Sequence, residues 1–205
     1  GGGAATGSES VAIGPGAASQ GIRSVAMGGY DTKAIGINTT AIGSGATADG
    51  NDATALGNNA QAIGKYSTAV GNLAKANQDF STALGYQATA EALRSTAIGM
   101  QAKVEGAGAT DSMAIGNGTQ VTGAYSVALA QEAKAKADFS SAVGYLAEAN
   151  SSGSTAIGAW ANTSGVDSAA LGNHAKASGS QSLALGNAAE ASDIASNAIG
   201  YSAKA

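Results

Sequence analysis

The sequence predicts an all-β fold, a solenoid of 14-residue coils, and three observations lead to this prediction. A five-residue pattern recurs along the whole chain of 205 residues, side chains alternate around it with a period of two, and side-chain bulk is scarce. The chain holds 50 alanines and 31 glycines, about two residues in five. Such a chain must bury thin, repeated layers or stay disordered, and the repeat favours layers.

The first half of each coil is the motif Ser or Thr, any residue, Ala, an aliphatic residue, Gly. Clear copies begin at Ser10, Ser95 and Ser154, and relaxed matching gives sixteen copies. Most are spaced 14 residues apart, with some spacings of 7, one of 8 and one of 17. Their fifth residues are Gly14, Gly28, Gly36, Gly43, Gly57, Gly64, Gly71, Gly85, Gly99, Gly116, Ala130, Gly144, Gly158, Gly172, Gly186 and Gly200.

The second half of each coil is a weaker pattern of two variable residues, Ala, a polar residue and Ala, as at residues 86–90 and 131–135. Both halves alternate with a period of two, and five residues is an ordinary strand length. A helix is disfavoured because each recurring glycine would cost it about 1 kcal/mol. Two short strands joined by two tight bends therefore make one coil.

The alternation also predicts what each strand buries. In the second strand the polar residue is expected to face water, and its flanking alanines to face inward. The first strand is apolar on both faces, because all sixteen copies carry Ala third and Ile, Leu, Val or Met fourth. With the alanines inside, the fourth residues form an outer stripe; the opposite arrangement would also leave an apolar ladder at an interface. The stripe is Ile13, Met27, Ile35, Ile42, Leu56, Ile63, Val70, Leu84, Ile98, Ile115, Leu129, Val143, Ile157, Leu171, Leu185 and Ile199.

A continuous aliphatic stripe predicts self-association. Leaving it in water would forfeit about 1.5–3 kcal/mol per side chain, and it exceeds the apolar patch that a monomer normally exposes. Other copies of the chain are therefore expected to cover it. A dimer and a trimer with a rotation axis along the coils both satisfy this requirement.

Charge and composition exclude several kinds of partner. Ten basic and fourteen acidic residues give a net charge of −4, with no basic block, so neither nucleic acid nor an anionic membrane surface is an expected partner. No apolar run is long enough to span a membrane, and the first residues do not resemble a signal peptide. The absence of cysteine excludes disulfides and thiolate metal sites.

The repeated Ser-Val-Ala-Ile-Gly of residues 10–14, carried on 14-residue coils, resembles the YadA-like head of trimeric autotransporter adhesins of Gram-negative bacteria. The resemblance covers residues 4–205. It implies a left-handed parallel β-roll assembled as a parallel homotrimer, at the tip of a stalk anchored in the outer membrane. The chain is then expected to be one repeat domain over residues 1–205, about 14 coils, without stalk or anchor. Ala130, the half-length spacings and the insertion at residues 104–111 depart from the pattern.

The resemblance implies adhesion at the bacterial cell surface. Heads of this family bind extracellular matrix proteins such as collagen, fibronectin or laminin, bind host-cell receptors, or bind one another in autoagglutination. The matching residues form the scaffold, so they do not choose among these ligands. A non-binding spacer or surface-layer rod is the alternative.

One group of side chains is a candidate for ligand contact. Leu146, Trp160 and His174 fall one coil apart directly after a bend, next to Tyr145 and Lys176. An exposed aromatic side chain among polar neighbours suits a hot spot for protein binding; packing within the chain or against another subunit is the alternative. The insertion at residues 105–111 is a second candidate. Tyr125, Phe80 and Phe139 precede motif serines and are expected at the edges between subunits.

Catalysis is not expected, because the chain offers ladders of like side chains rather than the convergent unlike groups of an active site. His174 is the sole histidine, and the hexapeptide repeat of left-handed β-helical acyltransferases is absent. No cofactor or metal is expected, since the carboxylates are scattered. A threonine ladder that includes Thr54 and Thr68 suggests ice or surface binding, but other residues interrupt it, and the margin of a subunit interface explains it better.

Overall fold

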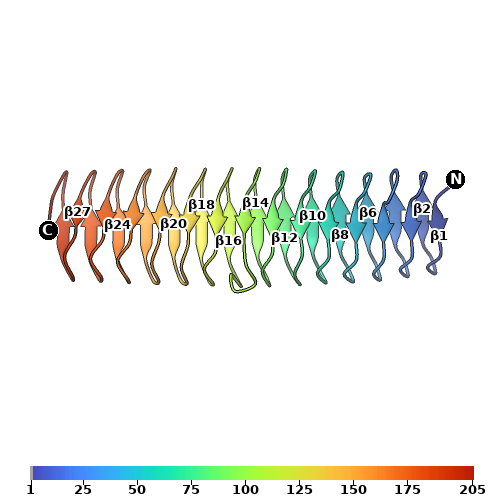
Figure 1. Cartoon of the computed structure of the whole chain (residues 1–205), viewed down its shortest axis with the longest axis horizontal. Helices are drawn as coiled ribbons and strands as arrows, with labels where there is room; N and C mark the ends of the chain where they lie inside the picture. Colours follow the sequence, from blue (N-terminus) through green and yellow to red (C-terminus); the bar gives the residue numbers. More distant parts are fainter. Residues whose placement is uncertain (1) are drawn as a thin grey trace. The chain divides into compact units, whose positions relative to one another are not determined.

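The computed structural model describes residues 2–205 and confirms the all-β prediction. The chain is a parallel β-solenoid of about 14 turns, with no helix among the described residues. Each coil contributes one strand to each of two sheets (Figure 1). Two compact units are distinguished, Gly1–Ala102 and Lys103–Ala205, and they are described separately below. The single repeat domain over residues 1–205 stays a prediction.

In the first unit the odd-numbered strands form one sheet and the even-numbered strands the other. The odd sheet contains β1 (Ala4–Ala5), β3 (Ala18–Ser19), β5 (Lys33–Ala34), β7 (Thr47–Ala48), β9 (Gln61–Ala62), β11 (Lys75–Ala76) and β13 (Thr89–Ala90). The even sheet contains β2 (Val11–Ile13), β4 (Val25–Met27), β6 (Thr40–Ile42), β8 (Thr54–Leu56), β10 (Thr68–Val70), β12 (Thr82–Leu84) and β14 (Thr96–Ile98).

The second unit repeats this arrangement. Its odd sheet contains β15 (Lys103–Val104), β17 (Gln120–Val121), β19 (Lys134–Ala135), β21 (Glu148–Ala149), β23 (Asn162–Thr163), β25 (Lys176–Ala177) and β27 (Glu190–Ala191). Its even sheet contains β16 (Met113–Ile115), β18 (Val127–Leu129), β20 (Ser141–Val143), β22 (Thr155–Ile157), β24 (Ala169–Leu171), β26 (Leu183–Leu185) and β28 (Asn197–Ile199).

The strands pair in parallel with a register of 14 residues, so equivalent positions of successive coils stack directly. Thr68 pairs with Thr82, for example. The register is 15 residues between β3 and β5 and 17 between β15 and β17. These are the places where the motif spacing departs from 7 or 14. The extra residues lie in turns, so pairing continues beyond them.

The strands are shorter than the five residues expected, two in the odd sheets and three in the even sheets. The remaining residues form two turns per coil, each of which holds one residue near φ +55°, and most turns after an even strand add the motif glycine at a larger positive φ. Asn59 (φ 54°) and Tyr66 (φ 57°) occupy these positions in neighbouring turns. Tight turns of this kind leave few residues for the ladders.

The core is a stack of alanines, as the alternation predicts. The central Ala of almost every even strand and the last residue of most odd strands are fully buried between the sheets. Val104 and Val121, which pair across β15 and β17, are the largest fully buried side chains. The two sheets therefore approach closely, and the side chains on either side of each central Ala point outward.

Most motif serines are buried, and their hydroxyls stabilise the preceding turn. Ser95 Oγ donates to the carbonyl oxygen of Ala92 at 2.6 Å, and Ser168 Oγ donates to that of Gly165 at 2.7 Å. The carbonyl oxygen three residues upstream thereby gains a hydrogen-bond partner that the pairing between strands does not supply.

The motif glycine is required by the backbone. Gly172 has φ 143°, and a Cβ there would collide with the carbonyl oxygen of Gly186 in the next coil. Ala130 is the exception at this motif position, and its φ is 93°. The coil accommodates this alanine by a change of backbone angle.

Candidate functional site: two outer faces and their turns

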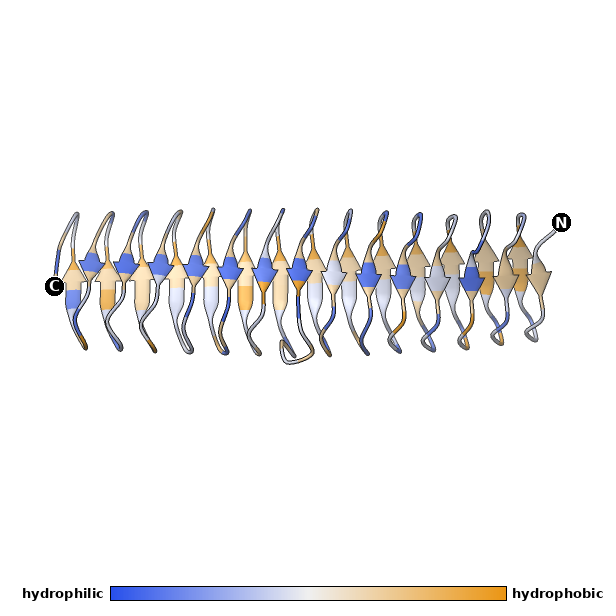
Figure 2. Ribbon diagram, in the orientation of Figure 1, coloured by the Kyte–Doolittle hydropathy of each residue, from blue (hydrophilic) through white to orange (hydrophobic). Residues whose placement is uncertain are grey.

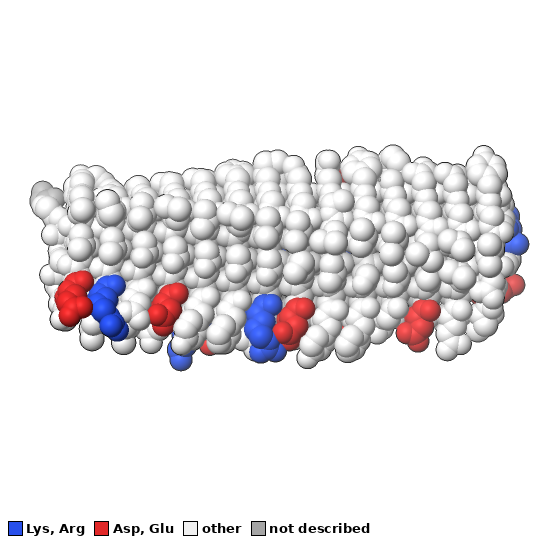
Figure 3. Space-filling model, turned by 180° about the vertical axis from the view of Figure 1, so that it is seen from behind, with Lys and Arg blue, Asp and Glu red and all other residues white. Residues whose placement is uncertain are grey.

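The outer face of the even sheet is uncharged within both units. The residues before and after each central alanine point outward. None of them is charged in any even-numbered strand, from β2 to β14 in the first unit and from β16 to β28 in the second. Figure 3 shows such a face, with charged side chains confined to its edge. We call the fourth motif residues of these strands the aliphatic column. Its members are Ile13, Met27, Ile42, Leu56, Val70, Leu84 and Ile98 in the first unit, and Ile115, Leu129, Val143, Ile157, Leu171, Leu185 and Ile199 in the second.

Two residues of the expected stripe lie elsewhere. Ile35 follows β5 and Ile63 follows β9, and both strands belong to the odd sheet. These motif copies arise at half-length spacing, where the second strand of a coil happens to carry the first-strand sequence. Sequence alone places them on one stripe; the pairing places them on the other face. The aliphatic column therefore excludes them.

The outer face of the odd sheet is polar. In the second unit every lysine lies on or next to an odd-numbered strand, and the hydrophilic odd-numbered strands stand out in Figure 2. Lysine and glutamate are neighbours along the direction of stacking at Lys134 and Glu148 and at Lys176 and Glu190. The outer faces of the two sheets of this unit thus differ in kind, because one is uncharged and the other carries ion pairs.

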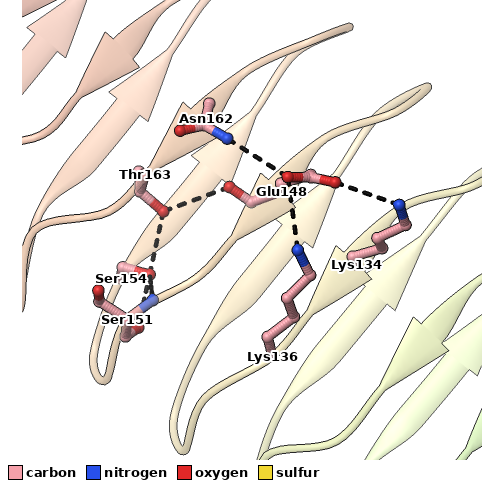
Figure 4. Close-up of polar contacts among 7 residues, drawn as sticks. All are labelled: Lys134, Lys136, Glu148, Ser151, Ser154, Asn162 and Thr163. Carbon is pink, nitrogen blue, oxygen red and sulfur yellow. Dashed lines mark hydrogen bonds and ion pairs between the residues drawn. The ribbon is translucent and has the colours of Figure 1, made fainter.

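Glu148 on β21 is the centre of one ionic cluster (Figure 4). Its Oε1 lies 3.2 Å from Lys134 Nζ, and its Oε2 lies 3.5 Å from Lys136 Nζ. Asn162 Nδ2 donates to Oε2 at 3.5 Å. Partial burial is the largest single effect on the pKa of Glu148 and would raise it, but the hydrogen bonds and charges of the two lysines together lower it below its ordinary value.

Glu190 on β27 is the centre of a second ionic cluster. Its carboxylate oxygens lie 3.6 Å from Lys176 Nζ and 3.3 Å from Lys204 Nζ. The hydrogen bond and charge of Lys204, with the charge of Lys176, lower the pKa of Glu190. Each glutamate is thus shared by two lysines, leaving one positive charge in excess per cluster.

An aromatic cluster lies on a turn of the second unit, where the sequence places its ligand-contact candidates. The rings of Trp160 and His174 stack with centroids 4.8 Å apart and planes 4° apart. Tyr145 meets Trp160 edge to face at 5.1 Å. Trp160 remains 44% exposed, and Leu146 precedes it by one coil in the same turn position. Lys176, the fifth candidate, lies two residues beyond His174 and is engaged with Glu190.

The sequence did not predict that aromatic residues would stack in the other row of turns. Tyr66 stacks on Phe80 with centroids 5.1 Å apart, and Tyr125 on Phe139 at 5.3 Å. All four rings are more than half exposed in the single chain. The 14-residue spacing within each pair was the available signal. The expected place of Phe80, Phe139 and Tyr125 at the edges between subunits stays a prediction.

Among residues 2–205, no three His, Asp or Glu side chains are grouped so that they could hold a metal ion. Over the same residues, no helix has the length and apolarity needed to cross a bilayer.

Comparison with protein families identifies the repeat. The family model of the YadA head domain repeat (2 copies) matches residues 5–30, 34–60, 62–88, 79–102, 107–129, 149–175 and 177–203. These segments take in most of the chain. The chain belongs to the YadA head-domain family.

Among solved structures, this YadA-type head is similar to the crystal structure of the collagen-binding domain of the Yersinia adhesin YadA. The identity is 27% and the TM-score 0.35, over 72% of this chain and 65% of that one. The chain thus spans a little less than two thirds of the length of that structure. The search of curated proteins gives no match.

Two departures from the YadA head repeat coincide with stretches outside the matched segments. Residues 130–148, the longest internal stretch outside them, begin at Ala130. Residues 103–106 open the 17-residue coil, whose loop projects beyond the turns of the following coils (Figure 1). A Cβ added to Gly106 or Gly108 would meet no atom within 4 Å, so this loop is loosely surrounded.

Proposed function

We propose that the chain is the head of a bacterial surface adhesin, in which three left-handed parallel rolls pack side by side and present their polar faces to a host protein. Membership of the YadA head-domain family supports this proposal. The observation that carries it is the segregation of the two outer faces, one uncharged and one ionic. Localisation at the cell surface, by a stalk and an outer-membrane anchor, belongs to the same proposal.

The aliphatic column supports the homotrimer. Many of its side chains are more than a third exposed in the single chain, among them Ile13, Leu56 and Leu185. Covering such a column stabilises the assembly by up to about 1.5–3 kcal/mol per side chain. Parallel copies in register bring equivalent aliphatic residues together around a common axis.

The ligand surface is then the part of each subunit that faces away from the axis. Tyr145, Trp160 and His174 form a rigid aromatic cluster, and Lys176 lies on the neighbouring polar strand. A partly exposed tryptophan held by two aromatic neighbours is a suitable anchor for a protein partner, because little side-chain entropy is lost on binding. Repetition of the surface on three chains would add multivalency.

An immobilised-ligand assay tests the function. The purified chain is applied to surfaces coated with collagen, fibronectin or laminin, and to host cells, and the bound protein is measured. Collagen is the first choice because the similar Yersinia domain is named for it. We expect saturable binding to at least one ligand and a loss of at least about tenfold in Trp160→Ala, the size of a typical hot spot.

The control is Tyr201→Ala, an exposed aromatic residue outside the cluster, which should bind like the wild type. Absence of binding to every matrix protein and cell type, with the chain folded, would favour the alternative of a structural spacer. Autoagglutination is measured separately, as sedimentation of cells that display the head. The proposed role includes neither catalysis nor a cofactor.

A further inference from the structure

In each unit, one row of turns carries a ladder of outward-facing residues at the edge of the even-sheet face. Its members are the left-handed residues directly before the motif Ser or Thr of each coil. Most of them donate the backbone N–H to a carbonyl oxygen of the preceding coil, as Phe139 does to Ala124 at 2.8 Å and Asp167 to Ser152 at 2.9 Å. Successive members are therefore held in register. We call this row the turn ladder.

Both units contain a run of Asp, Tyr and Phe in this ladder, at Asp52 to Phe80 and at Asp111 to Phe139, and they differ at the next member. In the first unit Tyr66 and Phe80 are followed, one coil on, by Arg94. In the second unit Tyr125 and Phe139 form an equivalent stack, but the next member is Gly153. An aromatic pair is thus followed by a cation in one unit and by no side chain in the other.

Gly153 leaves one side of the Phe139 ring open. Tyr125 covers the other side, with ring planes 7° apart. Phe139 is 62% exposed, against 54% for Phe80, which has Arg94 as its next neighbour in the ladder. Two coils separate Phe139 from the member after Gly153, a span of about 9–10 Å along the ladder.

That next member is Asp167, and its carboxylate leans back onto the glycine. The Oδ1 atom lies too close to Gly153 for a Cβ to fit there without moving the carboxylate. Asp167 is exposed, and its N–H donates to the carbonyl oxygen of Ser152. The nearby Asp138 uses its Oδ1 to accept the N–H of Ala124 at 2.9 Å. The carboxylate thus lies on the Gly153 coil, one coil beyond the Phe139 ring, with no side chain at position 153 between them.

The chemistry of this gap is that of a cation site. A cation within about 6 Å of a ring centroid is attracted by the π face, and a carboxylate opposite adds a charge-assisted hydrogen bond. A guanidinium group suits both partners, since it is planar enough to stack and presents several N–H donors. Lys136, the basic residue nearest in sequence, is paired with Glu148 and is not needed here.

We propose that Phe139, Gly153 and Asp167 form a slot for an arginine side chain of a partner polypeptide. The partner's guanidinium takes the place that Arg94 has in the ladder of the first unit. Residues 103–205 contain no arginine, so the same half of a second, in-register copy cannot supply it. The slot goes beyond the proposed adhesion, because it binds guanidinium whichever host protein is the ligand.

The two phenylalanines of the chain allow a direct test with an internal control. Ring signals of ¹³C-labelled Phe are followed by NMR in the intact protein while N-acetyl-arginine amide is added at low salt. Phe139 should shift with half-saturation on the order of tens of millimolar, as expected for one weak cation–π contact plus one exposed ion pair. Phe80 should not shift. The citrulline analogue, neutral but of the same shape, should leave both signals unchanged.

Two variants make the outcome decisive. Asp167→Asn should weaken arginine binding about two- to fivefold, whereas Asp193→Asn, which removes an exposed carboxylate from another turn, should not change it. Gly153→Arg should occupy the slot with an arginine of the chain itself and abolish the shift of Phe139. Arg94 shows that the backbone of this left-handed position accepts arginine (φ 53°), and the exposed Asp167 carboxylate must turn aside for its Cβ. No shift of Phe139 in the wild type, equal shifts of both rings, or an equal response to citrulline would overturn the proposal.

Discussion

Glycine at the fifth motif position allows neighbouring coils to stack at the spacing of hydrogen-bonded β-strands. At Gly172 the positive φ excludes most side chains, and the carbonyl oxygen of Gly186 occupies the space that a methyl group would need. On the side of the preceding coil, Gly172 N–H donates to the carbonyl oxygen of Ile157 at 2.8 Å. The residue is thus constrained by both of its neighbours, and its identity follows from the stacking itself.

Gly172→Ala is therefore expected to destabilise the fold by about 1–3 kcal/mol, the usual cost of a strained backbone position. Urea unfolding followed by circular dichroism measures the change. The matched control is Gly108→Ala in the open loop, where a Cβ meets nothing within 4 Å. If both variants unfold at the midpoint of the wild type, the collision does not limit the substitution.

Side-chain directions were predictable at the residue scale because strict alternation leaves only two choices. Once Lys and Glu alternate with Ala, as at 134–135 and 148–149, the charged residue must point outward and the alanine inward. The left-handed turn residues were not predictable. Tyr, Phe, Asp and Arg all occupy them, and only the stacking of turns, which is a tertiary feature, makes this conformation common to all.

Ion pairs between coils couple the stability of the odd sheet to pH. Glu148 ionises more readily in the folded chain than in the unfolded chain, because Lys134 and Lys136 outweigh the effect of its partial burial on the pKa. The folded pKa lies below the ordinary value of 4.5. Its contribution to stability is thus fully present above that value and is lost as the pH falls through the folded pKa.

The temperature of the unfolding midpoint should consequently decrease as the pH is lowered below about 4.5. This decrease should be smaller in Glu148→Gln than in the wild type, because the variant has no ion pairs to lose at this position. Thermal unfolding between pH 7 and pH 3 measures both. Glu9→Gln, in an exposed turn, serves as the control and should follow the wild type. Parallel curves for Glu148→Gln and wild type would show that the ion pairs with Glu148 do not contribute.

The long coil shows how an element tolerates insertion. Lys103 pairs with Gln120 and Val104 with Val121, so both strands are retained in spite of the extra residues. Lys103 and Glu105 form an ion pair at 3.2 Å at the base of the loop. Loop extension of this size has a small entropic cost, and the sheets continue through the following coils.

Removal of residues 106–108 restores a 14-residue coil and should leave the thermal midpoint within about 2 °C of the wild type, because no buried contact of these residues is lost. Differential scanning calorimetry measures the midpoint, with removal of residues 145–147, which takes out buried Ala147, as the comparison that should be strongly destabilising. A large loss in the first variant would mean that the loop is part of the packed structure.

At the scale of elements, the sequence indicated two strands per coil but not their lengths or every assignment. Strand length depends on how many residues of each coil lie in the two turns. Both turns contain more residues than a single bend at glycine, so the strands are shorter than expected. Ile35 and Ile63 were misplaced for a related reason, since Lys-Ala-Ile-Gly and Gln-Ala-Ile-Gly fit the first-strand motif locally. The strand pairing assigns them to the odd sheet, because β5 pairs with β3 and β9 pairs with β7.

At the scale of the whole molecule, the account rests on the contrast between the two outer faces. An ionic face is stable in water by itself. The aliphatic column is not, and no residue among 2–205 covers it, since its side chains are partly or largely exposed. Self-association around this column is therefore the central claim, and the proposed adhesion uses the surface that the assembly leaves exposed.

The molar mass in solution tests that claim most directly. Light scattering coupled to size-exclusion chromatography at micromolar concentration should give about three times the mass of one chain. Leu171→Lys, on the aliphatic column, should shift the mass toward that of a single chain, while Lys176→Leu on the odd sheet should not. A wild-type protein that is folded, monodisperse and of single-chain mass would contradict the account.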